Sequence, residues 1–577
     1  MESLLSGRRF VLILILLLAV TPYFVRLGAS SLWDSNEAFY AETPREMIET
    51  GDYINPSFNY QPRFNKPPLS YWVVAGFYKL FGISESVERL AIALAALAMI
   101  ATAYGLGHAV LSKEAGLLAA IGLAASPRFL MFSRRIMIDV YLAMFMSLAL
   151  LLFILAERHP ERRRLFLAAM YASISLGILT KGPVAALLPA LAFVIYLAID
   201  RRLKEIRRLM LPAGAAIMAL IVLPWYLAVY LQHGWGYIAS FILRDNLSRY
   251  GELAWGPSRG PLFYAGVIIG DFFPLSLFLV PALWFEIRER LSQRRARAFP
   301  IAAEDRSIDP ELRTTRGASQ ETHVLLLITW ITVIVVFFSF SKSKEDLYIL
   351  PIYPAAAAIA GRVMARWFAG ATTLTVPLGV TTTIVAVVMV AAGAVVFYLF
   401  GREGGYQLGG ATGIGSIAVA GGLITIGFLS AGKRSVAVLS SVFAVIIFNW
   451  VFVLRTLPDF ERYKPVRALC ELAGTKPQEA LVGYYRLASP SMTFYLRRPI
   501  FEYYLPEEIN TALTSEKDVY CVMTAAEYDL LDGNVKAKTH VLARRPMFQV
   551  KLKSILDRVE PPQVLLVSNK GGVSIAQ

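Results

Sequence analysis

The feature that most constrains this chain is a series of apolar runs, each roughly as long as the 18–25 residues that a helix needs to cross the hydrocarbon core of a bilayer. Hydrophobic residues make up 56% of the 577 residues and charged residues only 17%, whereas a soluble domain carries about a quarter charged residues. We therefore expect about thirteen membrane-spanning helices. They are placed near residues 10–28, 87–110, 115–132, 139–156, 165–180, 183–199, 209–231, 262–285, 323–340, 347–361, 376–400, 411–430 and 435–454.

Two apolar runs need separate interpretation. The run Phe10–Leu27 follows two arginines, but it is long and has no clear small-residue cleavage site, so it is interpreted as a retained first span and not a signal peptide. The run over 69–82 is too short to cross a bilayer and begins after Pro67 and Pro68. It is predicted to be a re-entrant or interfacial helix.

The basic residues of the connecting loops indicate the orientation of the spans. Cytoplasmic loops are enriched in Lys and Arg, and alternate loops of this chain are basic. They contain Arg158 and Arg162–Arg164; Arg201, Arg202, Lys204, Arg207 and Arg208; Arg288, Arg290, Arg294, Arg295 and Arg297; Arg362 and Arg366; and Lys433 and Arg434. This parity predicts a cytoplasmic N-terminus. An odd number of spans then places residues 456–577 outside the cytoplasm.

The last 122 residues differ in composition from the rest and are expected to form a second, small α/β domain. We therefore divide the chain into a membrane domain, residues 1–455, and a C-terminal domain, residues 456–577. Strands are predicted at Ala480–Tyr485, Val519–Met523 and Gln563–Ser568, and helices near 465–474 and 524–531. Both cysteines, Cys470 and Cys521, lie here; a disulfide between them and two buried free thiols are both open alternatives.

The candidate catalytic carboxylates lie in or beside the loops on the outer side. Asp34 and Glu37 stand where the first outer loop turns into a helix next to the bilayer, and a carboxylate there can act as a general base for an acceptor hydroxyl or amine. Glu42, Arg45, Glu46 and Glu49 follow at helical spacing and are interpreted as ordinary salt bridges on a solvated helix. Asp139 heads an apolar span, where an acid is either functional or a helix cap.

Several cations also fall on the outer side, against the positive-inside trend. Lys181 lies in a tight Gly-Pro connection, Lys344 in a polar loop before Tyr348, and Arg249 in a third polar segment. Such cations suit the phosphate or pyrophosphate of a lipid carrier, and anionic lipids of the outer leaflet are the alternative. Lys66 precedes Pro67 and Pro68, and an interfacial anchor and a lipid-phosphate ligand are equally open for it.

Some functional classes have little support in the sequence. There is no Gly-rich dinucleotide fingerprint and no Gly-Lys-Ser/Thr phosphate loop, which disfavours a nucleotide-dependent enzyme. Five histidines without clustered Cys/His spacing give weak support to a metal site, and no metal ligand is assigned. The net charge of +15 is attributed to cytoplasmic loops in contact with lipid, so no nucleic-acid partner is expected.

A series of motifs in order along the chain resembles a known family. They are Trp33-Asp34-x-Asn36-Glu37-Ala38-x-Tyr40-Ala41-Glu42 with Arg45-Glu46-Met47, Lys66-Pro67-Pro68-Leu69, Arg134 to Asp139, Thr180-Lys181-Gly182-Pro183, Pro224-Trp225-Tyr226, Asn246 with Arg249, Gly260-Pro261, Phe272-Phe273-Pro274, Ser341-Lys342-x-Lys344-x-x-x-Tyr348-x-Leu350-Pro351, and Pro490-Ser491-x-x-Phe494-Tyr495. Together they resemble the bacterial integral-membrane glycosyltransferases related to the lipid A aminoarabinose transferases and the protein O-mannosyltransferases.

The resemblance implies a GT-C fold: a multi-span helical bundle with interfacial helices in the first outer loop and a periplasmic C-terminal domain, in the bacterial inner membrane. It implies inverting transfer of a hexose or pentose from a polyprenyl-phosphate donor to lipid A, another glycolipid or a protein. A carboxylate among Asp34, Glu37 and Asp139 would activate the acceptor. The residues that would hold the donor phosphate are Tyr40, Lys66, Arg134, Lys181, Arg249, Lys344 and Tyr348.

Two positions depart from the family pattern. Asn36 stands where the family usually has an aspartate, so Asp34 or Glu37 would have to serve as the base. Asn65 stands where the aminoarabinose transferases have a glutamate before Lys-Pro-Pro, which argues against aminoarabinose and against a divalent metal at that carboxylate. A lipid flippase or transporter and a catalytically silent relative that binds polyprenyl phosphate are the alternative functions.

Overall fold

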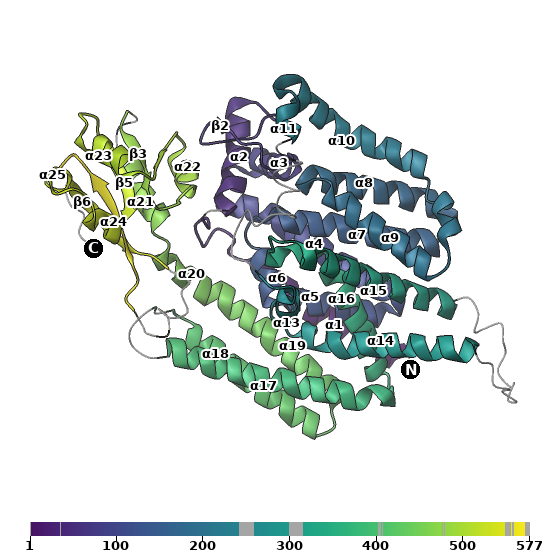
Figure 1. Cartoon of the computed structure of the whole chain (residues 1–577). Helices are drawn as coiled ribbons and strands as arrows, with labels where there is room; N and C mark the ends of the chain where they lie inside the picture. Colours follow the sequence, from purple (N-terminus) through teal and green to yellow (C-terminus); the bar gives the residue numbers. More distant parts are fainter. Residues whose placement is uncertain are drawn as a thin grey trace, which may run out of the picture.

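The computed structural model describes most of the chain as one helical bundle with a smaller sheet-containing part at one end (Figure 1). The described residues are 2–34, 36–239, 259–298, 316–401, 408–475, 479–548 and 559–571, together with positions 241, 406, 477 and 556. Arg249, a predicted phosphate ligand, lies outside them.

Long apolar helices form the bundle. Their bounds are α1 Glu2–Val20, α4 Glu85–Val110, α5 Lys113–Ala125, α7 Ile138–Arg158, α8 Arg163–Lys181, α9 Val184–Ile199, α10 Leu211–His233, α13 Phe263–Asp271, α14 Leu275–Ala298, α15 Arg316–Phe340, α16 Tyr353–Phe368, α17 Thr375–Phe400, α18 Ala411–Ser430 and α19 Arg434–Val451. In the described part of the chain, nine helices are long and apolar enough to cross a membrane, or ten if the bent pair α13–α14 counts as one span.

The expectation of a many-span membrane bundle is therefore confirmed, while thirteen spans stay a prediction. All thirteen expected segments are helical. Three of them are not among the nine or ten: α1, the pair formed by α5 and the short α6 Pro127–Phe132, and α9 with 16 residues. Ser126, the N-cap of α6, separates α5 from α6 and breaks the expected span over 115–132.

Short helices and turns connect the long helices of the bundle. They are η1 Thr21–Tyr23, α2 Asn36–Thr50, α3 Leu69–Phe81, η2 Pro160–Arg162, η3 Leu203–Arg208, α11 Trp235–Ala239, η5 Asp346–Ile352, η6 Thr372–Leu374, η7 Phe452–Thr456, α20 Leu457–Phe460 and η8 Glu461–Tyr463. The predicted short helix over 69–82 is α3, which begins directly after Pro68. The first outer loop also contains a two-stranded antiparallel ribbon, β1 Ser57–Phe58 and β2 Gln61–Pro62.

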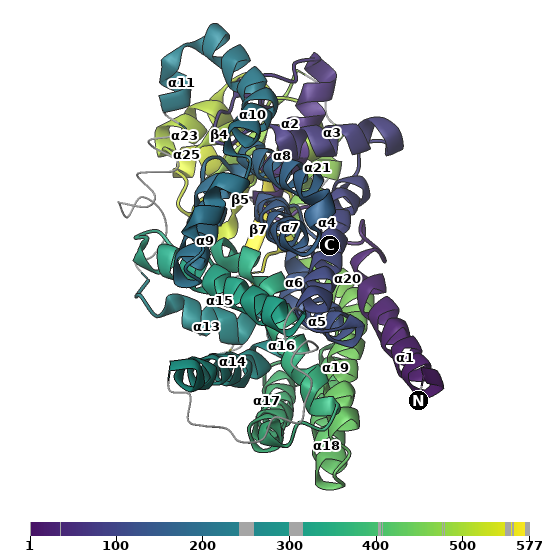
Figure 2. The ribbon, with the colours of Figure 1, turned by 90° about the vertical axis from the view of Figure 1, so that its right-hand side faces the viewer.

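Small residues allow the central helices to approach one another closely. A Cβ added at Gly361 of α16 would lie 2.6 Å from the carbonyl oxygen of Ala115 in α5, and one at Gly107 of α4 would lie 2.8 Å from the same oxygen. Backbones pack at this distance only where a side chain is absent, a common arrangement between membrane helices. In Figure 2, α17, α18 and α19 form a separate group beside this centre.

The C-terminal part is a five-stranded mixed sheet with helices on its faces. The strands are β3 Leu481–Tyr485, β4 Phe501–Tyr503, β5 Val519–Thr524, β6 His540–Pro546 and β7 Gln563–Ser568, in the order β4-β3-β5-β7-β6. The helices are α21 Pro465–Gly474, α22 Ser491–Leu496, α23 Pro506–Thr514, α24 Ala525–Asp529 and α25 Gly533–Lys536. β4, β3 and β5 run parallel, whereas β7 is antiparallel to both β5 and β6.

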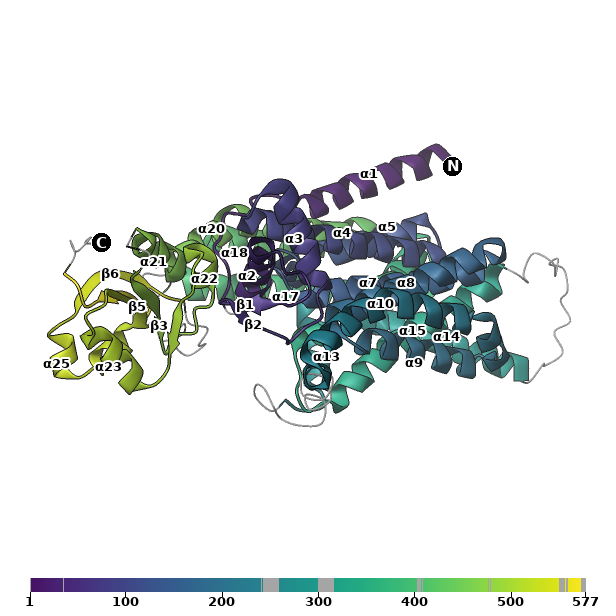
Figure 3. The same cartoon turned by 90° about the horizontal axis from the view of Figure 1, so that it is seen from above.

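The predicted strands and helices of this part are confirmed within two residues, whereas β4, β6, α22, α23 and α25 were not predicted. Cys470 and Cys521 are both buried free thiols and belong to the two different apolar clusters of this part, so they do not pair. Seen from above, the sheet lies beyond the end of the bundle that carries α2 and α3 (Figure 3). This arrangement puts the C-terminal part directly against the first outer loop.

Candidate functional site

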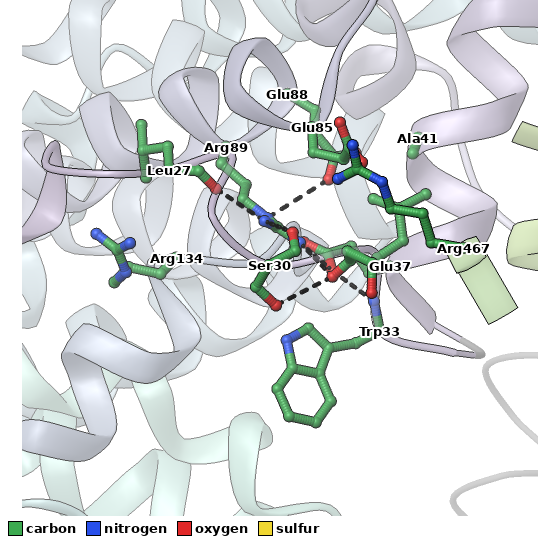
Figure 4. A network of polar contacts seen from close by, with 12 residues as sticks. Leu27, Ser30, Trp33, Glu37, Ala41, Glu85, Glu88, Arg89, Arg134 and Arg467 are labelled. Carbon is green, nitrogen blue, oxygen red and sulfur yellow. Dashed lines mark hydrogen bonds and ion pairs between the residues drawn. The ribbon is translucent and has the colours of Figure 1, made fainter. Parts of the chain in front are cut away.

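A buried ion pair fixes the first outer loop to the bundle. Glu37, in the first turn of α2, accepts hydrogen bonds from Arg89 Nε and Nη2, each at 2.9 Å, and from the Trp33 backbone N–H at 2.7 Å (Figure 4). Glu37 is 1% exposed and Arg89 is 2% exposed. Burial would raise the pKa of Glu37, but the charge and hydrogen bonds of Arg89 outweigh burial and hold that pKa below its usual value. Both carboxylate oxygens of Glu37 are therefore occupied.

Arg89 also gathers the loop backbone around itself. Its Nη atoms donate to the carbonyl oxygens of Leu27 at 2.8 Å, Ser30 at 2.6 Å and Ser31 at 3.0 Å. Beside it, Glu88 is fully buried, and neither of its carboxylate oxygens has a hydrogen-bond partner; one lies 3.8 Å from Arg89 Nε. One guanidinium thus faces two carboxyl groups inside the protein (Figure 4).

Asp34 joins the first loop to the C-terminal part. Its two carboxylate oxygens accept from the backbone N–H and from the Oγ of Ser491, each at 2.8 Å, at the start of α22. The residue stands at an exposed turn, but protein atoms surround the carboxylate. This burial raises the pKa of Asp34 to about 6, although the hydrogen bonds from Ser491 and the charge of Lys464 act in the opposite direction. Asp34 is thus both a docking residue and a carboxyl group that titrates near neutral pH.

Further contacts strengthen the same junction. Glu461 accepts from the Ser31 N–H at 2.9 Å, the Tyr495 hydroxyl accepts from the Leu32 N–H at 2.7 Å, and Lys464 donates to Ser30 and Ser31. The Lys464 ammonium also lies 4.3 Å from the centre of the Trp33 ring. The turn that carries Asp34 is therefore held from both sides, by Arg89 of the bundle and by the C-terminal part.

The expected salt bridges within α2 are confirmed; the pair of Arg45 with Glu42 is buried, whereas Glu49 is half exposed. Arg45 donates to Glu42 at 2.7 and 2.8 Å and to Glu49 at 2.6 Å, and Glu46 accepts from Ser57 at 2.5 Å. Glu42 and Glu46 are fully buried, and Arg45 is nearly so. The bond from Ser57 to Glu46 holds α2 against β1, and the carboxylate oxygens of Glu42 both accept from Arg45.

A second polar cluster forms where α7, α8 and the loop before η5 meet. Lys181, at the end of α8, donates to Asp139 in the first turn of α7. Its ammonium also lies 4.6 Å from the centre of the Tyr348 ring. The three residues were predicted separately from distant parts of the sequence, and the fold brings them together. The Asp139 and Lys181 side chains are only 13% and 16% exposed, so their attraction is weakly screened by water.

Two more cations lie beside this cluster: Lys344 in the loop before η5, and Arg259 in the segment before α13. Lys344 is buried and donates to the Ser341 carbonyl at 2.5 Å, and Arg259 donates to the Lys344 carbonyl at 2.6 Å and lies 3.6 Å from Glu345. In the same loop, Asp346 accepts from Arg128 of α6, which also reaches Asp271 of α13 at 3.4 Å. Paired anionic and cationic side chains therefore lie at neighbouring ends of α6, α7, α8 and α13.

The remaining predicted phosphate ligands have other neighbours. Arg134 is buried and donates to the carbonyl oxygens of Pro22 at 2.5 Å, Val25 at 2.9 Å and Arg26 at 3.2 Å, where it closes the turn after α1. The rings of Tyr40 and Tyr71 stack with their centres 5.7 Å apart. Lys66 is partly buried in the loop before α3. Phosphate binding by these three residues stays a prediction.

An apolar cavity of about 540 Å³ opens beside the second cluster. Among the described residues that line it, Arg128 and Asp271 are the charged ones; the others come from α6, α13, α14, α17–α19, η7 and Phe273 and are apolar or glycine. The described residues contain no group of three or more His, Cys, Asp or Glu side chains placed to hold a metal ion.

Sequence reasoning missed several residues of these two clusters. Arg89 had a usable signal, because a Glu-Arg pair inside an otherwise apolar span requires partners. Arg135 and Ser491 stood inside two of the family-like motifs but were assigned no role. Lys464 and Arg128 had no signal, because their positions depend on segments far away in the sequence.

Comparisons with known proteins agree on one superfamily. The family described as dolichyl-phosphate-mannose-protein mannosyltransferase matches residues 65–227. An uncharacterized protein of Aquifex aeolicus is 32% identical over 354 residues, which are 61% of this chain and 63% of that protein. An undecaprenyl phosphate-alpha-4-amino-4-deoxy-L-arabinose arabinosyl transferase of Proteus mirabilis is 27% identical over 352 residues, which are 60% of this chain and 58% of the relative. The chain thus spans about 60% of the length of these relatives.

The fold matches a solved structure over nearly its whole length. The crystal structure of ArnT from Cupriavidus metallidurans bound to undecaprenyl phosphate superposes with a TM-score of 0.72 at 22% identity, covering 98% of this chain and 99% of that one. The same protein in the apo state gives a TM-score of 0.73. At this identity the match establishes a shared fold.

Proposed function

We propose that this chain is an integral-membrane GT-C glycosyltransferase related to the lipid A aminoarabinose transferases and the protein O-mannosyltransferases. In this proposal it transfers a sugar from a polyprenyl-phosphate donor to an acceptor at the periplasmic face of the bacterial inner membrane. The acceptor is a lipid, with lipid A or another glycolipid as the first candidates, or a protein. The proposed topology has thirteen spans, a cytoplasmic N-terminus and residues 456–577 outside.

One observation carries the proposal: Asp139, Lys181 and Tyr348 meet at the outer ends of three separate segments, next to Lys344 and Arg259. When a polyprenyl-phosphate sugar reacts, the leaving group is a lipid phosphate. Its developing charge needs fixed cations, and such preorganised electrostatic stabilisation is usually the largest catalytic contribution. Lys181, Lys344 and Arg259 would supply these cations.

We assign the base to Asp139. When the donor phosphate binds, the Lys181 ammonium pairs with the phosphate in place of Asp139. The Asp139 carboxylate is then free to accept a proton. The acceptor O–H or N–H bond breaks as its proton passes to Asp139, and the acceptor atom bonds to the anomeric carbon. The bond from that carbon to the phosphate oxygen breaks, and its electron pair leaves with the polyprenyl phosphate. A single displacement of this kind inverts the anomeric configuration.

Of the other two candidate bases, Glu37 fits the role poorly and Asp34 remains second. Both oxygens of Glu37 accept from Arg89, and the pair is buried, so a proton could reach Glu37 only if that pair broke. Asp34 has a pKa raised toward neutrality but lies beside the C-terminal part, in the other cluster. Asn36, exposed at the start of α2, has an amide that cannot take up a proton near neutral pH.

The test uses purified full-length protein in detergent with labelled polyprenyl-phosphate sugar, and it follows the release of polyprenyl phosphate and the label in the acceptor. Asp139→Asn is expected to lower transfer by about 10²- to 10⁴-fold, the usual contribution of general-base catalysis, while binding of polyprenyl phosphate persists. Asp200→Asn is the matched control, because Asp200 is also paired with an arginine, Arg202, but at a basic, cytoplasmic loop. Full transfer by Asp139→Asn would remove the assigned base. Translocation of carrier lipid without any sugar transfer would favour a flippase instead.

A further inference from the structure

Arg135 contacts aromatic rings, whereas the neighbouring arginines contact acids or backbone carbonyls. It lies in the short segment between α6 and α7, with its guanidinium carbon 5.6 Å from the centre of the Trp33 ring and 5.8 Å from that of the Phe132 ring. Such cation–ring contacts orient a guanidinium without neutralising its charge.

Other arginines of this region have acidic or carbonyl partners within the protein, although the Nε of Arg134, like that of Arg135, is buried without one. Arg89 pairs with Glu37, Arg128 pairs with Asp346 and Asp271, and Arg134 donates to three carbonyls. For Arg135, the described residues provide neither an ion pair nor a hydrogen bond, and its Nε is buried without a partner. A partly buried cation with an unpaired N–H is costly unless an anion compensates it.

The position of Arg135 connects the two polar clusters. The charged groups that act on it electrostatically are Glu37 and Arg89 on the first-loop side and Arg128 and Asp346 on the side of the η5 loop. Trp33, one of its two rings, directly precedes Asp34 in the turn that the C-terminal part holds. A ligand spanning the two clusters would therefore pass this guanidinium.

We propose that Arg135, beside Trp33 and Phe132, binds the phosphate group of a lipid substrate. The proposal rests on the proposed function, because it assigns one more ligand to the same site. A guanidinium offers a planar fork of donors that fits two phosphate oxygens, and the rings of Trp33 and Phe132 keep that fork from collapsing onto Asp346 or Glu37. The phosphate belongs either to the polyprenyl-phosphate donor or to a phosphorylated lipid acceptor.

Binding measurements on the purified full-length protein test the proposal without requiring catalysis. The probes are polyprenyl phosphate against the corresponding polyprenol, and lipid A against dephosphorylated lipid A. Arg135→Gln should weaken binding of one phosphorylated probe by about 10- to 100-fold, the range expected for a lost charge-assisted hydrogen bond, and should leave its dephosphorylated counterpart unchanged. Arg135→Lys keeps the charge but loses the fork, so its loss should be smaller.

The matched control is Arg288→Gln. The Arg288 guanidinium also lies over a tryptophan, 5.1 Å from the centre of the Trp284 ring, but in α14 near the predicted cytoplasmic end. Size-exclusion profiles and unfolding temperatures confirm that each variant is folded. Loss confined to polyprenyl phosphate identifies the donor as the source of the phosphate, and loss confined to lipid A identifies the acceptor.

Equal binding of both phosphorylated probes by Arg135→Gln and wild-type protein would overturn the proposal, as would an equal loss for the dephosphorylated probes. The outcome of these binding measurements can be distinguished from the outcome of the transfer assay. A wild-type protein that transfers no sugar but binds a phosphorylated lipid through Arg135 would refute the proposed function and retain this site.

Discussion

Replacing Glu37 by Gln should weaken the attachment of the first outer loop to the bundle. Any loss of sugar transfer in this variant would then result from lower stability and not from loss of a catalytic base. The carboxylate accepts two hydrogen bonds of 2.9 Å from a guanidinium that is 2% exposed. Breaking a buried ion pair by removing one partner costs about 3–5 kcal/mol, because the other charge stays buried. Gln keeps one acceptor oxygen and nearly the same volume, so we expect a destabilisation near the lower end, about 3 kcal/mol.

The neighbouring Glu88 makes the prediction sharper. Its carboxyl group lies 3.8 Å from Arg89 Nε without a hydrogen bond, so it can take over part of the compensation when Glu37 is neutralised. The double variant Glu37→Gln/Glu88→Gln removes both acids and should lose more stability than the sum of the two single variants. Non-additivity of this kind is expected for groups that share one partner.

The assay is thermal unfolding of purified protein in detergent, with variants compared at one heating rate because unfolding of such proteins is commonly irreversible. Glu49→Gln is the matched control: Glu49 lies on the same helix and also pairs with an arginine, but it is 50% exposed. An exposed pair contributes about 0–1 kcal/mol, so this control should unfold close to wild type. Wild-type stability of Glu37→Gln combined with abolished transfer would refute the structural assignment and make Glu37 the base.

Two further predictions concern the junction and the helix core. The pKa of Asp34 is raised to about 6 from a usual value of 3.8, so the folded state favours its protonated form; its contribution to stability should be full below about pH 4 and decline as the pH rises through 6. The difference in unfolding temperature between wild type and Asp34→Asn, measured from pH 4 to 7, should therefore fall with pH, and a flat difference would contradict the raised pKa. Gly361→Ala should lower the unfolding temperature, because its Cβ would lie 2.6 Å from the Ala115 carbonyl oxygen, whereas Gly379→Ala, with no atom within 4 Å, should not; equal behaviour of the two would mean that α5 and α16 are not packed this closely.

Much of the membrane architecture followed from local sequence. A run of apolar residues must be helical in a bilayer, because no water is present to hydrogen-bond its backbone. All thirteen expected segments are accordingly helical, and the three predicted strands and two predicted helices of the C-terminal part are confirmed. The break at Ser126 and the bend of 117° between α13 and α14 were missed, because they depend on how neighbouring helices pack.

The candidate site was predictable only as a set of residue types on one side of the membrane. Asp139, Lys181 and Tyr348 were each selected from local context, and that selection could not state that the three would meet. Local context favoured Asp34 and Glu37 as functional carboxylates and left a helix cap open for Asp139. Their partners distinguish them: Ser491 for Asp34, Arg89 for Glu37 and Lys181 for Asp139.

The sequence by itself thus determined that this protein is a many-span helical membrane protein, because the bilayer imposes a length, a composition and a backbone conformation on each segment separately. Only the tertiary structure decided which acid is paired with a buried arginine, which acid is paired with Lys181, and that Arg135 has neither an ion pair nor a hydrogen bond among the described residues. Partners such as Arg135 and Trp33 are about a hundred residues apart in sequence, and electrostatic roles depend on distances in space that no local pattern encodes.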